Sequence, residues 1–113
     1  MKIVRRKILL AQLKNMAKKS FGNLVKAVVD VEKKIMAIDG ELHADEEALL
    51  LEKGSKQKNL WGINLYPKLK SSDWIEFDSM INLRPSSDNQ SRGVDSPQLR
   101  KKIMTIVNQL IER

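Results

Sequence analysis

The clearest fold signal in the sequence lies in two stretches, Leu60-Trp61-Gly62-Ile63-Asn64-Leu65-Tyr66-Pro67 and Trp74-Ile75-Glu76-Phe77-Asp78-Ser79-Met80-Ile81-Asn82-Leu83-Arg84-Pro85. Apolar residues alternate with polar ones along both, a pattern typical of strands that bury one face. Each stretch ends at a proline, which has no amide hydrogen to continue a strand ladder. The sequence therefore predicts two strands of a sheet, the first with Trp61, Ile63 and Leu65 facing the core.

Upstream of these strands, the continuous apolar run Ile35–Ile38 predicts a third strand. Asp39-Gly40 is a two-residue turn typical of hairpins, so residues 41–44 are expected to return as a fourth strand with Leu42 on the core face. Period two then brings two polar side chains together on the opposite face, those of Glu41 and His43.

Helical spacing of apolar residues appears in three other places. One amphipathic helix is expected from Leu9 to Lys19, a second over Phe21–Val29, and a third from a Ser96 cap to the end of the chain. Asp45 is expected to cap a short helix over residues 46–53, and the leucine run in this segment leaves a strand as the alternative.

The order of these elements predicts an α+β fold. We expect a single domain over residues 1–113, with a mostly antiparallel four-stranded sheet and helices packed on one face. The start, Lys2 to Lys7, is expected to be a short edge strand or a disordered lead-in. The most polar stretch, Ser86–Gly93, is expected to be a mobile loop.

The composition excludes several classes of protein. The absence of cysteine removes disulfides, thiolate nucleophiles and cysteine-ligated metal sites. We expect no cofactor and no metal, although carboxylates alone could hold magnesium or manganese. No apolar run reaches the roughly 20 residues of a membrane span, so we expect a cytoplasmic protein without membrane contact. The 21 Lys and Arg against 14 Asp and Glu give a net charge of +7, which attracts anions but is also typical of a solvated surface.

The polar face of the predicted sheet, together with one loop arginine, supplies the candidate binding site: Glu41, His43, Asn64, Trp74, Glu76, Asp78, Asn82, Arg84 and Arg92. Trp74 is expected to be an exposed stacking surface. In an enzyme, His43, Asp78 and Arg84 would supply acid-base groups and a positive charge for chemistry on a phosphodiester. The alternative is an ordinary solvated strand face with charges of both signs.

Three segments carry a resemblance to a known family, Gly40–Glu52, Leu60–Pro67 and Trp74–Pro85, and Lys26–Asp30 extends it. The chain resembles a small prokaryotic family that is defined only as a domain of unknown function. The similarity covers nearly the whole chain and implies one compact domain. It implies no activity, cofactor or partner, and so no functional residue.

Three functions are consistent with these residues. The first is a non-catalytic binding or regulatory module that uses the polar face and the loop Ser86–Gly93 to contact a protein partner or another copy of itself. The second is a small phosphodiester-acting enzyme built on His43, Asp78 and Arg84. The third is a nucleic-acid-binding domain, which the +7 charge favours and the carboxylates of the polar face oppose.

Overall fold

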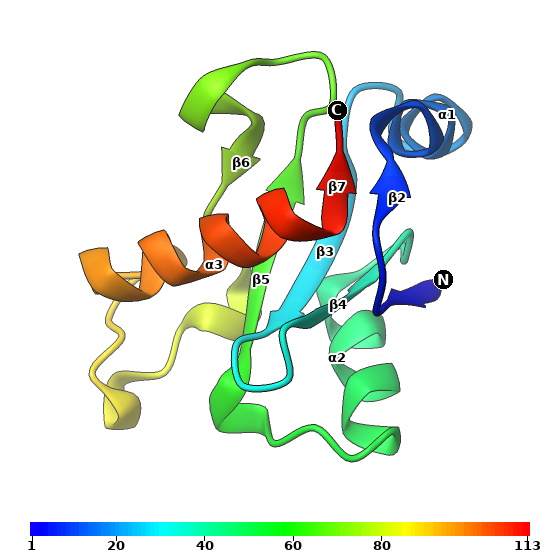
Figure 1. Cartoon of the computed structure of the whole chain (residues 1–113). Coiled ribbons are helices and arrows are strands. Elements are labelled where there is room, and N and C mark those ends of the chain that lie inside the picture. Colours follow the sequence, from blue (N-terminus) through cyan, green and yellow to red (C-terminus); the bar gives the residue numbers. More distant parts are fainter.

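Five strands form one antiparallel sheet at the centre of the computed structural model, which describes all 113 residues (Figure 1). The strands lie in the spatial order β1-β4-β3-β5-β6, and three helices pack on them. The bounds are β1 (Lys2–Val4), β3 (Val25–Asp30), β4 (Ile35–Ile38), β5 (Leu60–Leu65), β6 (Ile75–Glu76), α1 (Leu10–Lys19), α2 (His43–Glu52) and α3 (Pro97–Leu110). The predicted α+β class is confirmed, with five strands in the sheet where four were expected.

The central strand is β3, and it occupies part of the segment that was predicted to be a second helix. It pairs along its whole length with β5 and over its last four residues with β4. Every residue of β3 except Lys26 is buried. A strand that is covered on both faces shows a nearly continuous apolar run, and over so few residues such a run also fits helical spacing. The helix prediction was wrong for this reason.

The hairpin of the sheet joins β3 to β4 through residues 31–34, not through Asp39-Gly40. Asp30 closes it, because its Oδ1 accepts hydrogen bonds from the backbone amides of Glu32 and Lys33, both at 2.9 Å. After Gly40 the chain enters α2, so the predicted return strand is absent. A Cβ at Gly40 would lie 2.7 Å from Cγ of Glu46, so glycine is needed there for close approach of the helix.

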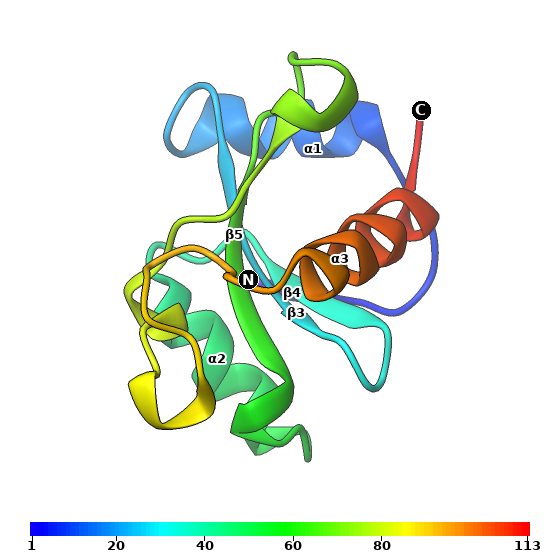
Figure 2. The same ribbon diagram turned by 90° about the vertical axis from the view of Figure 1, so that its left-hand side faces the viewer.

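The helices cover both faces of the sheet, which corrects the expectation of one covered face. The strands β1 and β3 run parallel with β4 between them, and α1 lies in their connection. The strands β4 and β5 run parallel with β3 between them, and α2 lies in theirs. Both connections, from β1 to β3 and from β4 to β5, move two places toward the same edge of the sheet. Their starting strands, β1 and β4, are antiparallel to each other. The usual right-handed crossover therefore puts the two helices on opposite faces, where they lie (Figure 2).

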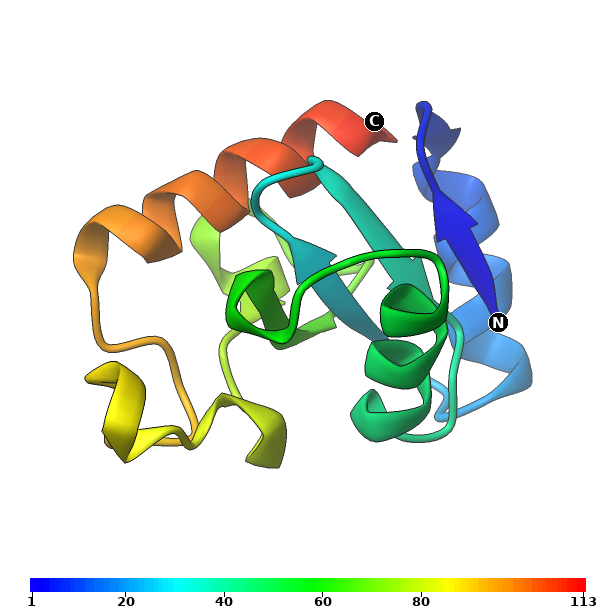
Figure 3. The same cartoon turned by 90° about the horizontal axis from the view of Figure 1, so that it is seen from below.

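The two faces have separate apolar clusters. Twenty buried residues, from α1, α3, the strands and the flanking loops, form the core on one face. On the other face Leu50 of α2 packs on Val28, Ala37 and Leu60 in a cluster of four. Figure 3 shows α2 and α3 on opposite sides of β3 and β4. We call the two sides the α1/α3 face and the α2 face.

The strand predicted over Trp74–Arg84 is much shorter than expected. Only Ile75 and Glu76 pair with β5, and the chain then continues through two single 3₁₀ turns, η3 (Met80–Asn82) and η4 (Pro85–Ser87). The side chain of Asn82 takes over the pairing, because its amide donates to the Gly62 carbonyl at 2.9 Å and its Oδ1 accepts from the Gly62 amide at 2.8 Å. The Asn82 side chain thus makes the hydrogen bonds to the backbone of β5 that a neighbouring strand was expected to make.

The two ends of the chain meet beside α1 and α3. The short strands β2 (Ile8–Leu9) and β7 (Ile111–Glu112) pair in parallel, apart from the main sheet. The Ser96 hydroxyl caps α3 by accepting from the Leu99 amide at 3.2 Å, and the predicted first and last helices are confirmed to within a residue or two at their starts. None of the three helices has the length and apolar character needed to cross a membrane.

Candidate functional site

A groove of about 380 Å³ opens on the α2 face, between the first turn of α2 and the segment that follows β6. Its floor is the polar side of β3 and β5. We call it the α2 groove. The side chains that line it and enter the argument below are Lys26, Leu42, His43, Asn64, Tyr66, Glu76, Asp78, Met80 and Arg92.

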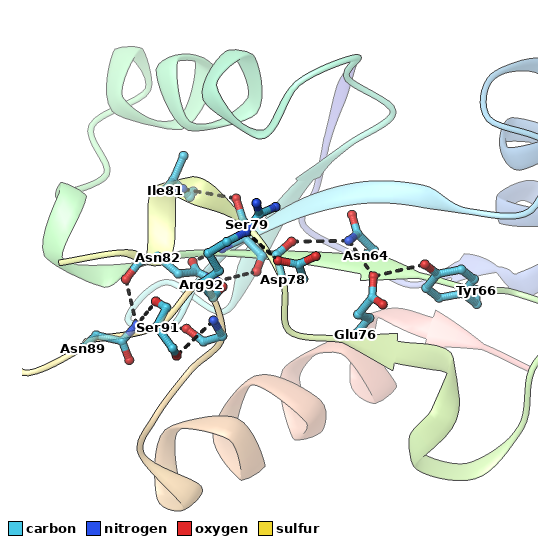
Figure 4. Close-up of polar contacts among 12 residues, drawn as sticks. Asn64, Tyr66, Glu76, Asp78, Ser79, Ile81, Asn82, Asn89, Ser91 and Arg92 are labelled. Carbon is cyan, nitrogen blue, oxygen red and sulfur yellow. Dashed lines mark hydrogen bonds and ion pairs between the residues drawn. The ribbon is translucent and has the colours of Figure 1, made fainter.

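Two carboxylates lie along the groove, each held by one oxygen (Figure 4). Oε1 of Glu76 accepts from the Asn64 amide at 2.9 Å and from the Tyr66 hydroxyl at 3.0 Å. Burial, followed by the contact with Glu76, raises the pKa of Tyr66, so the phenol stays protonated and donates. Oδ1 of Asp78 accepts from Nε of Arg92 at 2.8 Å. The second oxygen of each carboxylate has no partner within the chain.

Asn64 is the buried polar residue of the groove floor, with 8% of its surface exposed. Its Nδ2 donates to Glu76 and, at 3.3 Å, to the backbone carbonyl of Asp78, so the orientation of the amide is fixed by two acceptors. Its Oδ1 is buried and has no hydrogen-bond partner. An unpaired buried acceptor is costly and usually has a functional or solvent partner.

His43 is the first residue of α2 and reaches the middle of β5. Its Nε2 lies 2.8 Å from the carbonyl oxygen of Ile63, and since a carbonyl only accepts, Nε2 carries a proton. Burial lowers the pKa of His43, against the opposing effect of the Ile63 carbonyl, and the charge of Lys26 lowers it further. The lowered pKa leaves His43 mainly neutral at pH 7, and the neighbouring Asn64 side chain opposes this shift.

The rim of the groove is apolar. Leu42 is 55% exposed and Met80 is 62% exposed, and both line the groove. Leu42 was expected to face the core, but it stands at the N-cap of α2, where the chain leaves the sheet. Large apolar side chains exposed on opposite walls of one groove are typical of a surface that another molecule covers.

Five of the nine predicted site residues meet in this groove: His43, Asn64, Glu76, Asp78 and Arg92. They do so although β6 is short and His43 is on a helix, because both segments return to the same part of β5. The other four predicted residues, Glu41, Trp74, Asn82 and Arg84, lie elsewhere.

Trp74 is buried, which corrects the prediction of an exposed stacking surface. Only 2% of its surface is exposed, and the guanidinium of Arg113 lies 4.4 Å from its ring centroid. The residue ends the 3₁₀ turn η2 (Ser71–Trp74) and precedes β6, so the alternation of the following strand does not apply to it. It belongs to the core of the α1/α3 face.

Arg84 is a structural residue and is not part of the groove. Its guanidinium donates to the carbonyls of Gln57, Leu60 and Ile81, and it lies 4.6 Å from the ring centroid of Trp61. Glu47 lies 3.9 Å from it. With its nitrogens committed to carbonyls, Arg84 fixes the start of β5 and has no role beside His43 and Asp78.

Asn82 and Glu41 also depart from the predicted site. Asn82 is fully buried and pairs with both backbone groups of Gly62, as described above. Glu41 is exposed and borders a neighbouring hollow with Phe21 and Leu42. The expected strand geometry was wrong at both positions, since neither lies on a strand.

The loop Ser86–Gly93 is held in place by hydrogen bonds of the Asn89 side chain, and Asn89 is 3% exposed. Its Nδ2 donates to the carbonyls of Asn82, Ser91 and Gly93, and its Oδ1 accepts from the Asp95 amide at 2.8 Å. The polar composition of this loop thus supplies its internal hydrogen bonds, and Arg92 projects from a fixed base toward Asp78.

The model of a family described as protein of unknown function, DUF5674, matches residues 2–110. The chain belongs to this family. The DUF5674 match includes every residue of the groove and confirms the resemblance found in the sequence. Searches of curated proteins and of solved structures find no match to the chain.

Four of these groove residues were not among the predicted site residues: Lys26, Leu42, Tyr66 and Met80. Lys26 is the one polar residue within the apolar run 25–29 of β3, and that interruption was the available signal. Leu42 was assigned to a strand that does not exist, and Met80 to the part of the predicted strand beyond β6 that does not form. No group of three or more His, Asp or Glu side chains is gathered in a geometry suited to a metal ion.

Proposed function

We propose that this domain is a non-catalytic binding module that takes a short segment of a protein partner into the α2 groove. The observation that carries the proposal is the pairing of an apolar rim, Leu42 and Met80, with a polar floor whose hydrogen-bonding groups are only half used. Apolar anchors surrounded by unpaired polar groups are the usual composition of a protein-binding surface.

The unpaired carboxylate oxygens of the groove favour a partner with a lysine or arginine. Glu76 and Asp78 each keep one carboxylate oxygen without a partner in the chain. A cationic head placed between them would form charge-assisted hydrogen bonds, and its aliphatic stem would pack on Leu42 or Met80. Oδ1 of Asn64 is one further acceptor for a donor of the same segment.

A phosphodiester substrate fits this groove less well. Its two carboxylates would repel the phosphate, and Arg92, the arginine beside them, is already paired with Asp78 at 2.8 Å. His43 holds its one proton toward the Ile63 carbonyl. We place the binding activity in a prokaryotic cytoplasm, an expectation that rests on the family resemblance and the cysteine-free chain.

The test is selection of a displayed library of random peptides on the immobilised protein. We expect enriched peptides to share an apolar residue next to a lysine or arginine. Leu42→Glu and Met80→Glu should each reduce the affinity of an enriched peptide by roughly tenfold or more, since each removes an apolar anchor. The matched control is Leu51→Glu, which changes a leucine that is 40% exposed on the last turn of α2, and its affinity should stay within about twofold.

Two results would contradict the proposal. One is a selection that enriches no sequence on the wild-type protein. The other is an equal loss for Leu51→Glu and for the groove variants. If instead the protein forms a dimer in solution that Met80→Glu dissociates, the occupant of the groove is a second copy, and the assignment to a separate protein partner is wrong.

A further inference from the structure

The helices on the two faces of the sheet carry charges of opposite sign. The helices of the α1/α3 face each carry three basic residues and no acidic one, whereas α2 carries four acidic residues and no basic one. The first acidic residue of the chain is Asp30, and eight lysines and arginines precede it. In Figure 2, α1 lies at the top and α3 at the right, opposite α2 at the lower left. The helices of the α1/α3 face thus carry six basic residues in all, and α2 carries four acidic ones.

Three hollows on this side are lined by basic residues and by no carboxylate. One of about 190 Å³, at the end of α1, is lined by Lys14, Lys18 and Lys68. A second of about 370 Å³ runs along α3 and contains Lys34, Lys101 and Lys102. A third of about 350 Å³ lies along β1 and its connection to β2, and four further basic residues line it. The only two ion pairs of the chain involve Arg84 and Arg92, so none of these ten cations is neutralised by a neighbour.

We infer that the α1/α3 side binds the phosphate backbone of double-stranded nucleic acid. Unpaired lysines spread over several hollows suit a polyanion with regularly spaced phosphates, because each contact releases condensed counterions and adds to affinity. The longest dimension of the molecule is 38 Å, which at about 3.4 Å per base pair corresponds to roughly one turn of duplex.

The burial of the aromatic residues favours a duplex over a single strand. Single strands are usually held by exposed aromatic side chains on which bases stack. Both tryptophans are buried, at 6% and 2% exposure, and the half-exposed Phe21 already has the Lys26 ammonium 5.2 Å from its ring centroid. The hollows at α1 and α3 each contain one apolar residue only, which disfavours a lipid surface. This inference is independent of the peptide site, because it uses other residues on the other side of the molecule.

The experiment measures binding of a fluorescent 20-base-pair DNA duplex by anisotropy between 50 and 200 mM salt, with exposed lysines changed in matched sets. The test variant is Lys14→Gln/Lys18→Gln/Lys68→Gln, and the control is Lys53→Gln/Lys56→Gln/Lys58→Gln, whose three lysines are exposed at the end of α2 and in the loop that follows it. Both variants lose three positive charges. We expect the test variant to lower affinity by about tenfold or more and to reduce the slope of log K against log salt by roughly 2 to 3, at about 0.9 per phosphate contact. The control should stay within about threefold of wild type.

Several outcomes would overturn the inference. Equal losses in the two variants would mean that net charge alone attracts the duplex. No binding at 50 mM salt, or tighter binding of a single strand than of the duplex, would exclude the proposed ligand. Binding to phosphatidylserine vesicles that the test variant abolishes, with duplex binding unchanged, would assign the lysines to a membrane surface.

Discussion

The two faces of one sheet are stabilised in different ways. The α1/α3 face buries a single cluster of twenty apolar residues, and its helices are amphipathic with basic outer surfaces. The α2 face has an apolar cluster of only four residues, and buried polar side chains such as Glu46, Asn64 and Asn82 complete it. The α1/α3 face is thus stabilised mainly by apolar packing, and the α2 face depends also on specific hydrogen bonds of buried side chains.

This difference explains where a binding site can form. A close-packed apolar core has no unpaired polar group in its interior, so a ligand of the α1/α3 face can contact only the outer surface of its helices, and a change of volume in this core lowers stability. A polar face whose partners are only partly satisfied keeps acceptors available, as Oδ1 of Asn64 and one oxygen each of Glu76 and Asp78 are. The groove lies on the face where packing is least complete.

The largest expected effect is on the apolar face. Trp74→Ala removes a side chain that is 2% exposed and should lower the free energy of unfolding by about 3 to 5 kcal/mol, measured by urea denaturation. The control, Phe21→Ala, truncates an aromatic ring that is 45% exposed and should cost less than about 1 kcal/mol. Equal costs for the two variants would mean that Trp74 is not a core residue.

The next effect comes from Glu46, a buried acid on the polar face. The residue is fully buried, with Oε2 accepting from the Gly40 amide at 2.9 Å and Oε1 unpaired, and this burial raises the pKa of Glu46 from 4.5 to about 9. Above pH 4.5 the unfolded chain releases this proton, while the folded protein keeps it up to about pH 9. Stability from this group is therefore complete below pH 4.5 and is lost as the pH rises toward 9.

The prediction is a stability that falls by roughly 3 kcal/mol between pH 6.5 and 8.5, at about 1.4 kcal/mol per pH unit. Glu46→Gln should remove most of this decline and be more stable than wild type at pH 8.5. Glu52→Gln, which changes an exposed acid of the same helix, should leave it intact. Parallel curves for wild type and Glu46→Gln would show that Glu46 is ionised in the folded protein.

The third prediction tests whether the Asn82 side chain supplies the hydrogen bonds that a strand paired with β5 would otherwise make. Asn82→Ala leaves the amide and the carbonyl of Gly62 without partners, and it also removes a hydrogen bond to the Arg92 carbonyl. Each unsatisfied buried group costs about 1 to 3 kcal/mol unless water replaces the partner, so we expect a loss of about 2 to 3 kcal/mol. Asn23→Ala, at an exposed position, is the control. Hydrogen exchange at the Gly62 amide should also become faster in Asn82→Ala alone.

The same contrast between faces decides how much the sequence could predict. The first and last helices were predicted because each buries one stripe, which leaves a clear period in the sequence. β5 was predicted because Gly62 and Asn64 interrupt its apolar residues with a period of two, although all six residues of the strand are buried. β3 could not be recognised, because both of its faces are covered and its period is lost. The strand after Trp74 was predicted too long, because nothing local shows that Asn82 will pair with Gly62, twenty residues away.

The candidate site was predicted in part for similar reasons. Asn64 and Glu76 lie opposite each other because both belong to real strands, which pair in antiparallel orientation. His43 and Arg92 reach the groove from a helix and a loop, so their meeting depends on the order of the strands and on the Asn89 contacts. Trp74 and Arg84 were misassigned because a strand pattern was extended beyond the strand. Long-range contacts, which a local pattern does not encode, determined each of these outcomes.

The smallest expected effect concerns Gly62 of β5, on which the segment after β6 packs closely. A Cβ at Gly62 would lie 2.6 Å from both Cβ and Oγ of Ser79, and 3.2 Å from Cγ1 of Ile81. Gly62→Ala must therefore push the segment after β6 away from the sheet, at a cost of about 1 to 2 kcal/mol in the free energy of unfolding.

Because the clash of Gly62→Ala is with Ser79, a second substitution at Ser79 should restore part of the lost stability. Ser79→Gly removes the two atoms nearest to the new methyl group, so the double variant should recover about 1 kcal/mol relative to the sum of the single changes. Ser79→Gly alone loses only a long hydrogen bond from the Ile81 amide, at 3.3 Å, together with the entropy cost of a glycine. Strictly additive costs in urea denaturation would mean that the segment moves freely and that Gly62 does not set the depth of the groove. A non-additive free energy for the two changes would instead show that the wall of the groove at Ser79 packs directly on Gly62 of β5.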